Sequence, residues 1–470
     1  MTTRRDLMKM AALGLGGLAV GCRLHQGAIS DPERASREAF LDDVQRRTFR
    51  FFWDTTNPRN GLARDRYPTP SFASMAAVGY ALTAYPIGVE RGYVGRGAAA
   101  ERVLATLRFL AAAPQGAARR GMTGHKGFFY HFVDMESGTR FENTELSTVD
   151  TALLLGGILF CQGYFDRPAE AEIRALAEGI YARVDWPWSQ ARAPLIALGW
   201  NPEGGHLPYD WVAYCEAMLV YILALGSPTH ALGPESWAGW AAGLPRRWGV
   251  EGGQEFVRFG PMFGHQYSHI WIDFREIRDA FMRDRHIDYF ENSRRATLAQ
   301  HAYAIANPMG WTGYGTNLWG LTACDGPADI TLEHGGRSLT FRSYAARGPG
   351  DFDDGTVAPT AAGGSIPFAP EICLSTLMTM RRDHGDHLYG GYGFLDALNP
   401  SFTATEVPLR HGRVIPGRGW YDSDYLGIDQ GPILAMIENH RSGLVWNVLR
   451  GNAHIRRGLR RAGFTGGWLE

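Results

Sequence analysis

Apolar residues recur along most of the chain every three or four positions, and the stretches between these regions are rich in glycine, aromatic residues and acids. This period is that of amphipathic helices, and runs typical of strands are few. The pattern predicts about twelve helices, counting a short one near Leu395. The others span Arg37–Thr55, Ser71–Val89, Ala98–Ala113, Leu146–Tyr164, Pro168–Val184, Asp210–Leu225, Asp273–Met282, Asp288–Ala306, Phe368–Arg382, Asp429–Arg441 and Gly443–Ala462.

Two successive predicted helices differ in how their polar residues are distributed. The segment Leu146–Tyr164 is apolar nearly all round, whereas Pro168–Val184 interleaves Glu172, Arg174 and Glu178 with apolar residues. The first is therefore predicted to be an inner helix and the second an outer one. Such helix pairs, alternating with long loops, favour an all-α toroid with elaborate loops at one end.

The N-terminus carries the pattern of an export signal. Two arginines, Arg4 and Arg5, precede an apolar run that ends at Gly21-Cys22. This pattern predicts a twin-arginine-type signal peptide with a lipobox over residues 1–22, in which the thiol of Cys22 is acylated. The leucine of this lipobox lies four places before Cys22 instead of the usual three. We expect an exported, periplasmic protein with a lipid anchor.

The rest of the chain shows no linker that would divide it. Residues 23–34 are interpreted as a tether and residues 35–470 as one domain, because no Pro- or Ser-rich stretch is long enough to separate two. No later segment approaches the roughly 20 apolar residues of a membrane-spanning helix. Membrane contact is therefore expected only through the lipid anchor.

The amino-acid composition indicates which class of molecule the protein binds. With a net charge of −1, the chain lacks the basic excess that nucleic acids and anionic membranes select. Its 14 Trp, 19 Tyr and 59 Gly are typical of sugar-binding clefts, which use aromatic faces on Gly-rich loops. The cysteines beyond the leader form no C-x-x-C pair and lie mostly in apolar runs, so we expect buried free thiols and no zinc site. They are Cys161, Cys215, Cys324 and Cys373.

One carboxylate stands among aromatic residues. Glu216 follows Trp211 and Tyr214 at the start of a predicted helix whose continuation, Ala217–Leu225, is apolar. A carboxyl group on the inner side of such a helix is partly desolvated, which raises its pKa toward the value that a general acid needs near neutrality. The segment taken alone is equally compatible with a solvated or salt-bridged glutamate.

A second acidic segment, ELSTVD, begins at Glu145. Asp150 lies one turn inside the predicted helix on its apolar face, so it should point toward the core or the cleft. Helix capping by Thr144 or Ser147, with acids favouring the helix dipole, explains Glu145 as well as catalysis does. It does not explain Asp150.

His265 and His269 lie four residues apart, as a metal-binding pair would on a helix. Gly264 breaks the helical pattern, however, and no third ligand follows at a diagnostic spacing. We therefore predict that both histidines hydrogen-bond to sugar hydroxyls and that no metal binds here. Asp273 and Arg275 follow, and would either form a salt bridge or bind substrate.

Three further acids, Asp422, Asp424 and Asp429, precede a predicted apolar helix. Their D-x-D spacing resembles a calcium loop, but the oxygen-rich continuation and closing Glu of an EF-hand are absent. One reading of Asp429 is a helix N-cap, and another is the second carboxylate of a glycosidase whose acid is Glu216. G-x-S-x-G, P-loop and H-E-x-x-H motifs are absent, which argues against the chemistries they carry.

Together these segments resemble the glycoamylase-like domain of glycoside hydrolase family 144, the bacterial β-1,2-glucanases. The resemblance is carried by ELSTVDTALLLGGIL from Glu145, GWNPEGGHLPYDWVAYCEAMLVYILALGSPTH from Gly199, FGHQYSHIWIDFR from Phe263, GYGTNLWGLTACDGP from Gly313, GTVAPTAAGGSIPFAPE from Gly355 and GWYDSDYLGIDQGPI from Gly419. These blocks extend over nearly the whole of residues 35–470, which would form the catalytic domain.

The resemblance implies an (α/α)6 barrel, no metal or organic cofactor, and hydrolysis of β-1,2-linked glucan with inversion. It also implies that Glu216 is the general acid. The base is less defined: the region of Asp424 and Asp429 is favoured, with Glu145 and Asp150 as rivals. Inversion places the two carboxyl groups roughly 6.5–9.5 Å apart, or farther where a proton relay intervenes.

We expect a monomeric, endo-acting enzyme whose partner is a β-glucan oligo- or polysaccharide. The alternatives are an exo-acting or transglycosylating β-glucan enzyme on the same barrel, and a non-catalytic glycan-binding lipoprotein, against which the presence of Glu216 weighs. Six aromatic residues are candidates to stack on glucose rings. They are Trp200, Tyr209, Trp211, Trp271, Trp319 and Trp420.

Overall fold

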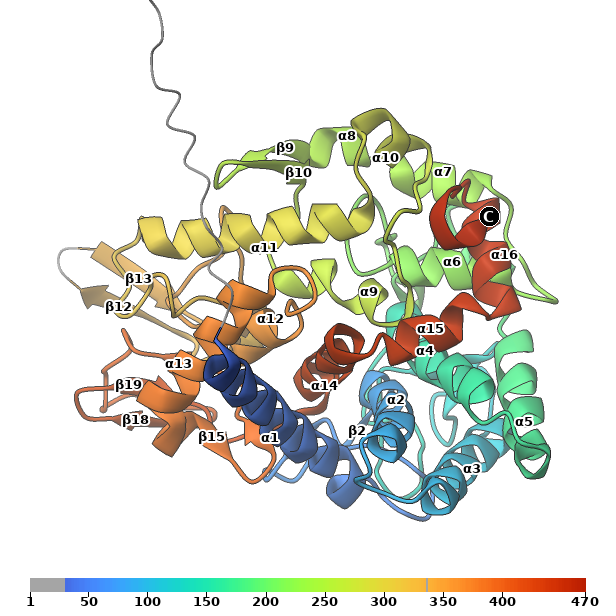
Figure 1. The fold of residues 1–470 in the computed structure, drawn as a ribbon. Coiled ribbons are helices and arrows are strands. Elements are labelled where there is room, and N and C mark those ends of the chain that lie inside the picture. The colour runs from blue at the N-terminus through green and yellow to red at the C-terminus, as the bar shows by residue number, and fades with distance from the viewer. Residues whose placement is uncertain (1–29, 335–336) are drawn as a thin grey trace, which may run out of the picture. The chain divides into compact units, whose positions relative to one another are not determined.

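A computed structural model describes residues 30–334 and 337–470, and most of their regular structure is helical (Figure 1). The α-helices are α1 (Asp31–Thr55), α2 (Met75–Glu90), α3 (Arg96–Ala112), α4 (Thr148–Tyr164), α5 (Ala171–Ala182), α6 (Met218–Gly226), α7 (Glu235–Ala241), α8 (Leu244–Arg247), α9 (Tyr267–Trp271), α10 (Ala280–Arg285), α11 (Tyr289–Ala306), α12 (Pro359–Gly363), α13 (Pro370–Leu388), α14 (Gly427–Arg441), α15 (Leu444–Arg450) and α16 (Ala453–Arg461).

Short strands pair among the loops, and the widest sheet of the described residues has five strands in the order β3-β4-β6-β7-β8. The strands are β1 (Arg66–Tyr67), β2 (Ala73–Ser74), β3 (Gly124–His125), β4 (Phe128–Tyr130), β5 (Phe132–Val133), β6 (Leu146–Ser147), β7 (Gly199–Asn201), β8 (Gly205–His206), β9 (Trp248–Glu251), β10 (Gln254–Val257), β11 (Ala323–Asp325), β12 (Ile330–His334), β13 (Arg337–Phe341), β14 (Tyr344–Ala346), β15 (Tyr389–Gly390), β16 (Gly393–Phe394), β17 (Leu398–Asn399), β18 (Arg413–Ile415), β19 (Gly419–Tyr421) and β20 (Tyr425–Leu426).

Helices α2 and α4 pack with their backbones in close approach. A Cβ atom at Gly157 of α4 would lie 2.1 Å from the carbonyl oxygen of Gly79 in α2, and one at Gly79 would lie 2.4 Å from that of Leu153. Both positions therefore require glycine, because no side chain fits between the two backbones. Helix α4 is buried along nearly its whole length, as predicted for an inner helix, whereas α5 exposes a polar face.

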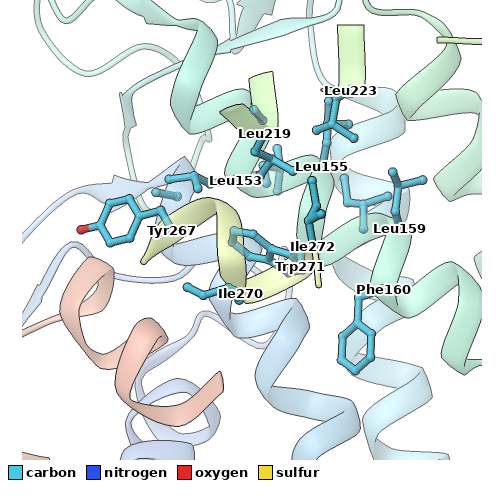
Figure 2. Packing of buried hydrophobic residues seen from close by; sticks show 14 of the residues in the cluster. Leu153, Leu155, Leu159, Phe160, Leu219, Leu223, Tyr267, Ile270, Trp271 and Ile272 are labelled. Carbon is cyan, nitrogen blue, oxygen red and sulfur yellow. The ribbon is translucent and has the colours of Figure 1, made fainter. Parts of the chain in front are cut away.

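Helices α4, α6 and α9 share one hydrophobic core (Figure 2). Leu153 of α4, Leu219 of α6 and Trp271 of α9 all belong to it. The Trp271 ring stacks on Tyr80 of α2, with centroids 5.3 Å apart, and its Nε1 donates a hydrogen bond to Thr83 at 3.0 Å. Burial of these side chains fixes the three helix starts that carry the site described below.

Two predicted helices begin later than the apolar pattern indicates. The helix predicted from Asp210 starts only at Met218, because Ala213 adopts a left-handed conformation with φ 59° that a helix does not allow. The helix predicted over Asp273–Met282 is reduced to α10, since Glu276 has φ 66°. Both backbone turns depend on tertiary contacts that the local pattern does not contain.

Two further predictions need correction. No helix forms near Leu395, which lies between strands β16 and β17. The single helix predicted over Gly443–Ala462 is two helices, because Asn452 caps α16 by accepting hydrogen bonds from the backbone N–H groups of His454 and Ile455. The short helices α7, α8, α9 and α12 lie outside the predicted ones.

The prediction of an all-α fold is corrected to a mainly helical fold with small sheets. The strands are two to five residues long. A strand of two residues shows no alternation of polar and apolar positions, so the sequence pattern does not reveal it.

Residues Phe40–Glu470 form one compact unit. Helix α1 begins at Asp31, inside the predicted tether, and the predicted signal peptide with Cys22 lies outside the described residues. Among the described helices, none combines the length and the apolar character needed to cross a membrane. The four cysteines of the described residues are buried and free, as predicted.

Candidate active site

A cavity of about 190 Å³ brings Glu216 and Asp150 together. Asp150 lies in the first turn of α4, and Glu216 lies in the turn that precedes α6. Apolar and aromatic side chains make up most of the remaining wall, so the two carboxyl groups face a partly desolvated space. The other lining residues are His131, Val149, Leu153, Phe263, Tyr267, Ala323, Tyr344 and Ile428.

Helix α9 fixes the backbone at Glu216. The hydroxyl of Ser268 donates to the Glu216 carbonyl oxygen at 2.8 Å and accepts from the backbone N–H of Leu219 at 3.0 Å. One serine therefore satisfies two groups at the start of α6 that the helix itself leaves unpaired. The left-handed turn at Ala213 then presents Glu216 to the cavity instead of burying it in a continuous helix.

The Glu216 carboxyl group has the properties of a proton donor. Its Oε2 atom is buried and has no hydrogen-bond partner among the described residues. Burial raises the pKa of Glu216 to about 7; a backbone hydrogen bond opposes this rise, and the nearby Asp150 carboxylate adds to it. A carboxyl group with this pKa remains protonated in a large share of molecules at neutral pH, as a general acid requires.

Asp150 is held by two side chains. The hydroxyl of Ser147, the N-cap of α4, donates to Asp150 Oδ2, and His131 Nε2 lies 3.6 Å from Oδ1. On its other side, His131 Nδ1 lies 2.9 Å from Glu145 Oε1. Burial alone would lower the pKa of His131, but Asp150 and Glu145 outweigh burial and raise it to about 9. The imidazole ring is therefore cationic at neutral pH and pairs with both carboxylates.

The register of the sheet brings His131 next to Glu145. Strands β4 and β6 pair with Tyr130 opposite Leu146, so His131, which follows Tyr130, meets Glu145, which precedes Leu146. The backbone N–H of His131 accordingly donates to the Glu145 carbonyl oxygen at 2.9 Å. Burial raises the pKa of Glu145, yet its hydrogen bond to His131 lowers it below the ordinary value overall. Glu145 is therefore a partner of His131 and not a helix cap.

Arg66 holds a second group of carboxylates close to this cavity. Its Nη1 lies 2.7 Å from Asp325 Oδ2 and 3.5 Å from Asp424 Oδ2. His411 Nδ1 lies 3.6 Å from the same Asp424 oxygen. A cavity of about 460 Å³, lined in part by Arg66 and His411, shares Tyr344 with the cavity of Glu216. The two cavities are therefore adjacent.

Three more aspartates, Asp396, Asp422 and Asp429, are buried near Asp325. Burial raises the pKa of all three, and neighbouring carboxylates raise it further. Burial and the neighbouring carboxyl group of Asp396 raise the pKa of Asp429, a predicted catalytic residue, well above its ordinary value. Helix α14 begins at Gly427, so Asp429 lies in its first turn and is not the N-cap.

Two sets of described side chains bring their ligand atoms close enough for one metal ion. They are Asp325, His411 and Asp424, and Asp325, Asp396 and Asp422. In each set, one oxygen or nitrogen per residue lies within 4.8 Å of the others. Both sets use carboxylates of the Arg66 group.

His265 and His269 lie in the core and not on a cavity wall. His265 makes hydrogen bonds with the Tyr214 hydroxyl at 3.2 Å and the Phe259 carbonyl oxygen at 3.1 Å, and His269 Nε2 lies 3.0 Å from Ser293 Oγ. Burial lowers the pKa of both histidines to about 3, so both are neutral. Their burial excludes the predicted hydrogen bonds to sugar hydroxyls.

Three of the aromatic residues predicted to stack on glucose are also core residues. Trp271, Trp319 and Trp420 are fully buried, so none presents a ring face to a ligand. Trp420 Nε1 donates to the His411 carbonyl oxygen at 2.9 Å. The prediction is wrong for these three residues. The sequence around a tryptophan does not show whether its side chain is buried in the core or exposed to a ligand.

The other three aromatic candidates are more accessible. Tyr209 is 68% exposed, Trp200 stacks on His125 with ring centroids 4.8 Å apart, and Trp211 Nε1 donates to Thr148 at 2.9 Å. They line neither of the two cavities described above. Their contact with glucan stays a prediction.

Asp273 and Arg275 form the salt bridge that was one of the two predicted alternatives. Arg275 Nη2 lies 2.7 Å from Asp273 Oδ2, and Arg450 contacts the same oxygen. The Arg275 guanidinium also lies over the Trp446 ring, 4.4 Å from its centroid. Because Asp273 is fully buried in this network, its predicted contact with substrate is excluded.

Several residues of the site were not predicted from the sequence. His131 had one detectable signal, since it interrupts the apolar run Phe128–Val133. Arg66 and Tyr344 had none, and Asp325 appeared only within the block from Gly313 that carries the resemblance. Pairing of β1 with β20 and of β11 with β14 places these residues.

A family model described as Glycoamylase, putative glucoamylase, matches residues 208–453, which is more than half of the chain and includes Glu216 and Asp429. The chain belongs to this family. Two solved structures are similar to it along almost their whole length. A putative glucoamylase from Bacteroides uniformis is 32% identical, with a TM-score of 0.79 over 92% of this chain and 99% of its own. An endo-β-1,2-glucanase from Chitinophaga pinensis, solved with sophorotriose and glucose, is 27% identical, with a TM-score of 0.77 and coverage of 92% and 99%.

A third relative of the chain is longer than the chain itself. The exo β-1,2-glucooligosaccharide sophorohydrolase of Parabacteroides distasonis is 28% identical over 459 residues, which cover 90% of this chain. The matched region makes up 58% of that relative's length.

Proposed function

We propose that the chain is a glycoside hydrolase that cleaves β-1,2-glucan with inversion and acts within the glucan chain. The observation that carries the proposal is the protonated Glu216 sharing one cavity with Asp150, which is paired with a cationic histidine. The similarity to an endo-β-1,2-glucanase along 99% of its length supports the substrate and the endo mode.

The proposal includes an (α/α)6 barrel. Helix α2 is buried on nearly all sides and the following helix, α3, is half-exposed. The same alternation recurs in α4, which is buried, and α5, which is half-exposed. This alternation is typical of inner and outer rings.

In the proposed reaction, Glu216 donates its proton to the glycosidic oxygen as the bond from the anomeric carbon to that oxygen breaks. Asp150 removes a proton from a water molecule whose oxygen attacks the anomeric carbon from the opposite face. The products are two shorter glucans, one with a new reducing end of inverted configuration. Glu216 is left ionised and Asp150 protonated, and exchange with solvent restores both.

Asp150 is the best placed of the candidate bases. It lines the cavity of the acid, whereas Glu145, Asp424 and Asp429 do not. Burial and Asp396 raise the pKa of Asp429 well above the ordinary value, which disfavours the ionised form that a base needs. Asp424 faces Arg66 in the neighbouring group. Glu145 acts through His131, which places it as a positioning residue.

The decisive experiment measures reducing ends released from β-1,2-, β-1,3- and β-1,4-glucans and from α-glucans. We expect release from β-1,2-glucan alone, with products of several lengths at early times. No release from any glucan, despite measurable binding, would show a glycan-binding protein and overturn the proposal. Release of a single short product from one chain end would show exo action, which the sophorohydrolase relative makes the second candidate.

We expect kcat/KM to fall as the pH rises above about 7. Burial raises the pKa of Glu216 to about 7, and the acid must be protonated to act, so each pH unit well above that value should cost about tenfold. The measurement is a profile of kcat/KM from pH 5 to 9, with circular dichroism at each pH as a check on folding. A flat profile up to pH 9 with intact fold would contradict the assignment of Glu216.

A further inference from the structure

Three buried aspartates from separate loops meet beside Arg66. Asp325 ends β11, Asp396 lies between β16 and β17, and Asp422 directly follows β19. At most 3% of each residue is exposed. One carboxylate oxygen from each of the three lies within 4.8 Å of the other two.

Two oxygens in this cluster have no donor. Asp396 Oδ2 accepts from the backbone N–H of Asp325 at 2.8 Å, and Asp422 Oδ1 accepts from that of Ser423 at 2.6 Å. Asp396 Oδ1 and Asp422 Oδ2 are buried and have no hydrogen-bond partner among the described residues. No ion pair to either residue occurs in the described part of the chain, whereas a buried carboxylate without a cation or donor is costly.

We propose that Asp325, Asp396 and Asp422 bind one divalent cation of the Ca²⁺ type. The ligand atoms are all carboxylate oxygens, which hard cations prefer. Two ligands of one ion are at most twice the metal–oxygen distance apart, which is about 5 Å for Ca²⁺ and about 4 Å for Mg²⁺. The ligand atoms in the cluster lie no more than 4.8 Å apart, which is within the limit for Ca²⁺.

Asp325 can bind Arg66 and a cation together. Arg66 occupies one lone pair on each Asp325 oxygen, at 2.7 and 3.3 Å, and an ionised carboxylate offers about four such positions. The alternative set with Asp424 is less suited to such an ion, because His411 supplies a ring nitrogen and hard cations prefer oxygen ligands.

The cation would strengthen a junction that the backbone has already formed. The backbone N–H of Asp396 donates to the Asp424 carbonyl oxygen at 2.9 Å, and that of Asp422 donates to the Ala397 carbonyl oxygen at 3.0 Å. A cation bound by the side chains would tie these two loops to β11. The proposal concerns stability and does not depend on the proposed glucanase activity.

The test uses the whole protein stripped with EGTA. We expect saturating CaCl2 to raise the melting temperature by at least about 2 °C, with MgCl2 at equal concentration giving less. Asp422→Asn should abolish the Ca²⁺ shift. Asp65→Asn is the matched control, because Asp65 lies beside Arg66 without belonging to the ligand set, and this variant should keep the shift.

A spectroscopic titration with Tb³⁺ provides a second readout. We expect Tb³⁺ emission sensitised through Trp420, two residues from Asp422, and its loss on addition of Ca²⁺. This measurement on wild-type protein decides the question if Asp422→Asn fails to fold, and Asp396→Asn then replaces it. An absent Ca²⁺ shift, an equal shift with Mg²⁺, or an unchanged shift in the folded variants would overturn the proposal.

Discussion

Glu216→Gln is expected to lower the turnover of β-1,2-glucan by about 10³-fold or more, because the amide cannot donate a proton to the leaving oxygen. The substitution keeps the size of the side chain and removes a carboxyl group whose pKa burial has already raised to about 7. The fold and most of the glucan affinity should therefore persist. Initial rates of reducing-end release, together with calorimetric titration of a short β-1,2-glucan, measure the two effects separately.

The matched control is Glu235→Gln on α7, an exposed glutamate that does not line the cavity. It should retain the wild-type rate. A Glu216→Gln variant with a rate close to wild type would show that another group is the acid, and a variant that no longer binds glucan would show that Glu216 serves binding.

Asp150→Asn is expected to lower turnover by about 10² to 10⁴-fold, because the amide cannot accept a proton from the attacking water. The asparagine oxygen can still accept the hydrogen bond from Ser147, which should preserve the start of α4. Added azide should restore part of the rate, since this anion attacks the anomeric carbon without a base. The product is then a glycosyl azide of inverted configuration, detectable by NMR.

Asp429→Asn and Asp424→Asn provide the comparison for Asp150. Because burial raises the pKa of Asp429 and Asp424 faces Arg66 and His411, neither variant should gain activity from azide. If azide restores activity to one of these variants and not to Asp150→Asn, the residue replaced in that variant is the base. This result would contradict the assignment of Asp150.

The acid and the fold class depend on different kinds of information in the chain. Glu216 became a candidate because a carboxylate beside aromatic residues and a long apolar run is a local pattern, and the family resemblance made it the predicted acid. The long helices α4 and α11 were found for the same reason, since their period repeats over several turns. The two-residue strand β6 could not be found, although it directs Asp150 into the cavity.

The local sequence pattern does not predict whether the aromatic residues and histidines are buried. Trp420 and His269 have sequence surroundings typical of a sugar cleft, yet both are fully buried. Whether a loop residue points inward depends on which distant segment covers it, and one sequence does not contain that contact as a pattern.

The sequence by itself determined the periodicity of the long helices and the buried character of α4, and it made Glu216 the predicted acid and Asp150 one of the candidate bases. Those features follow from residues near one another in the chain. Only the tertiary structure decided that Asp150 shares a cavity with Glu216, that His131 pairs with Asp150, and that Arg66 contacts aspartates from distant segments. The physical reason is that charge pairing and desolvation depend on distances in space, and strand pairing between remote segments sets those distances.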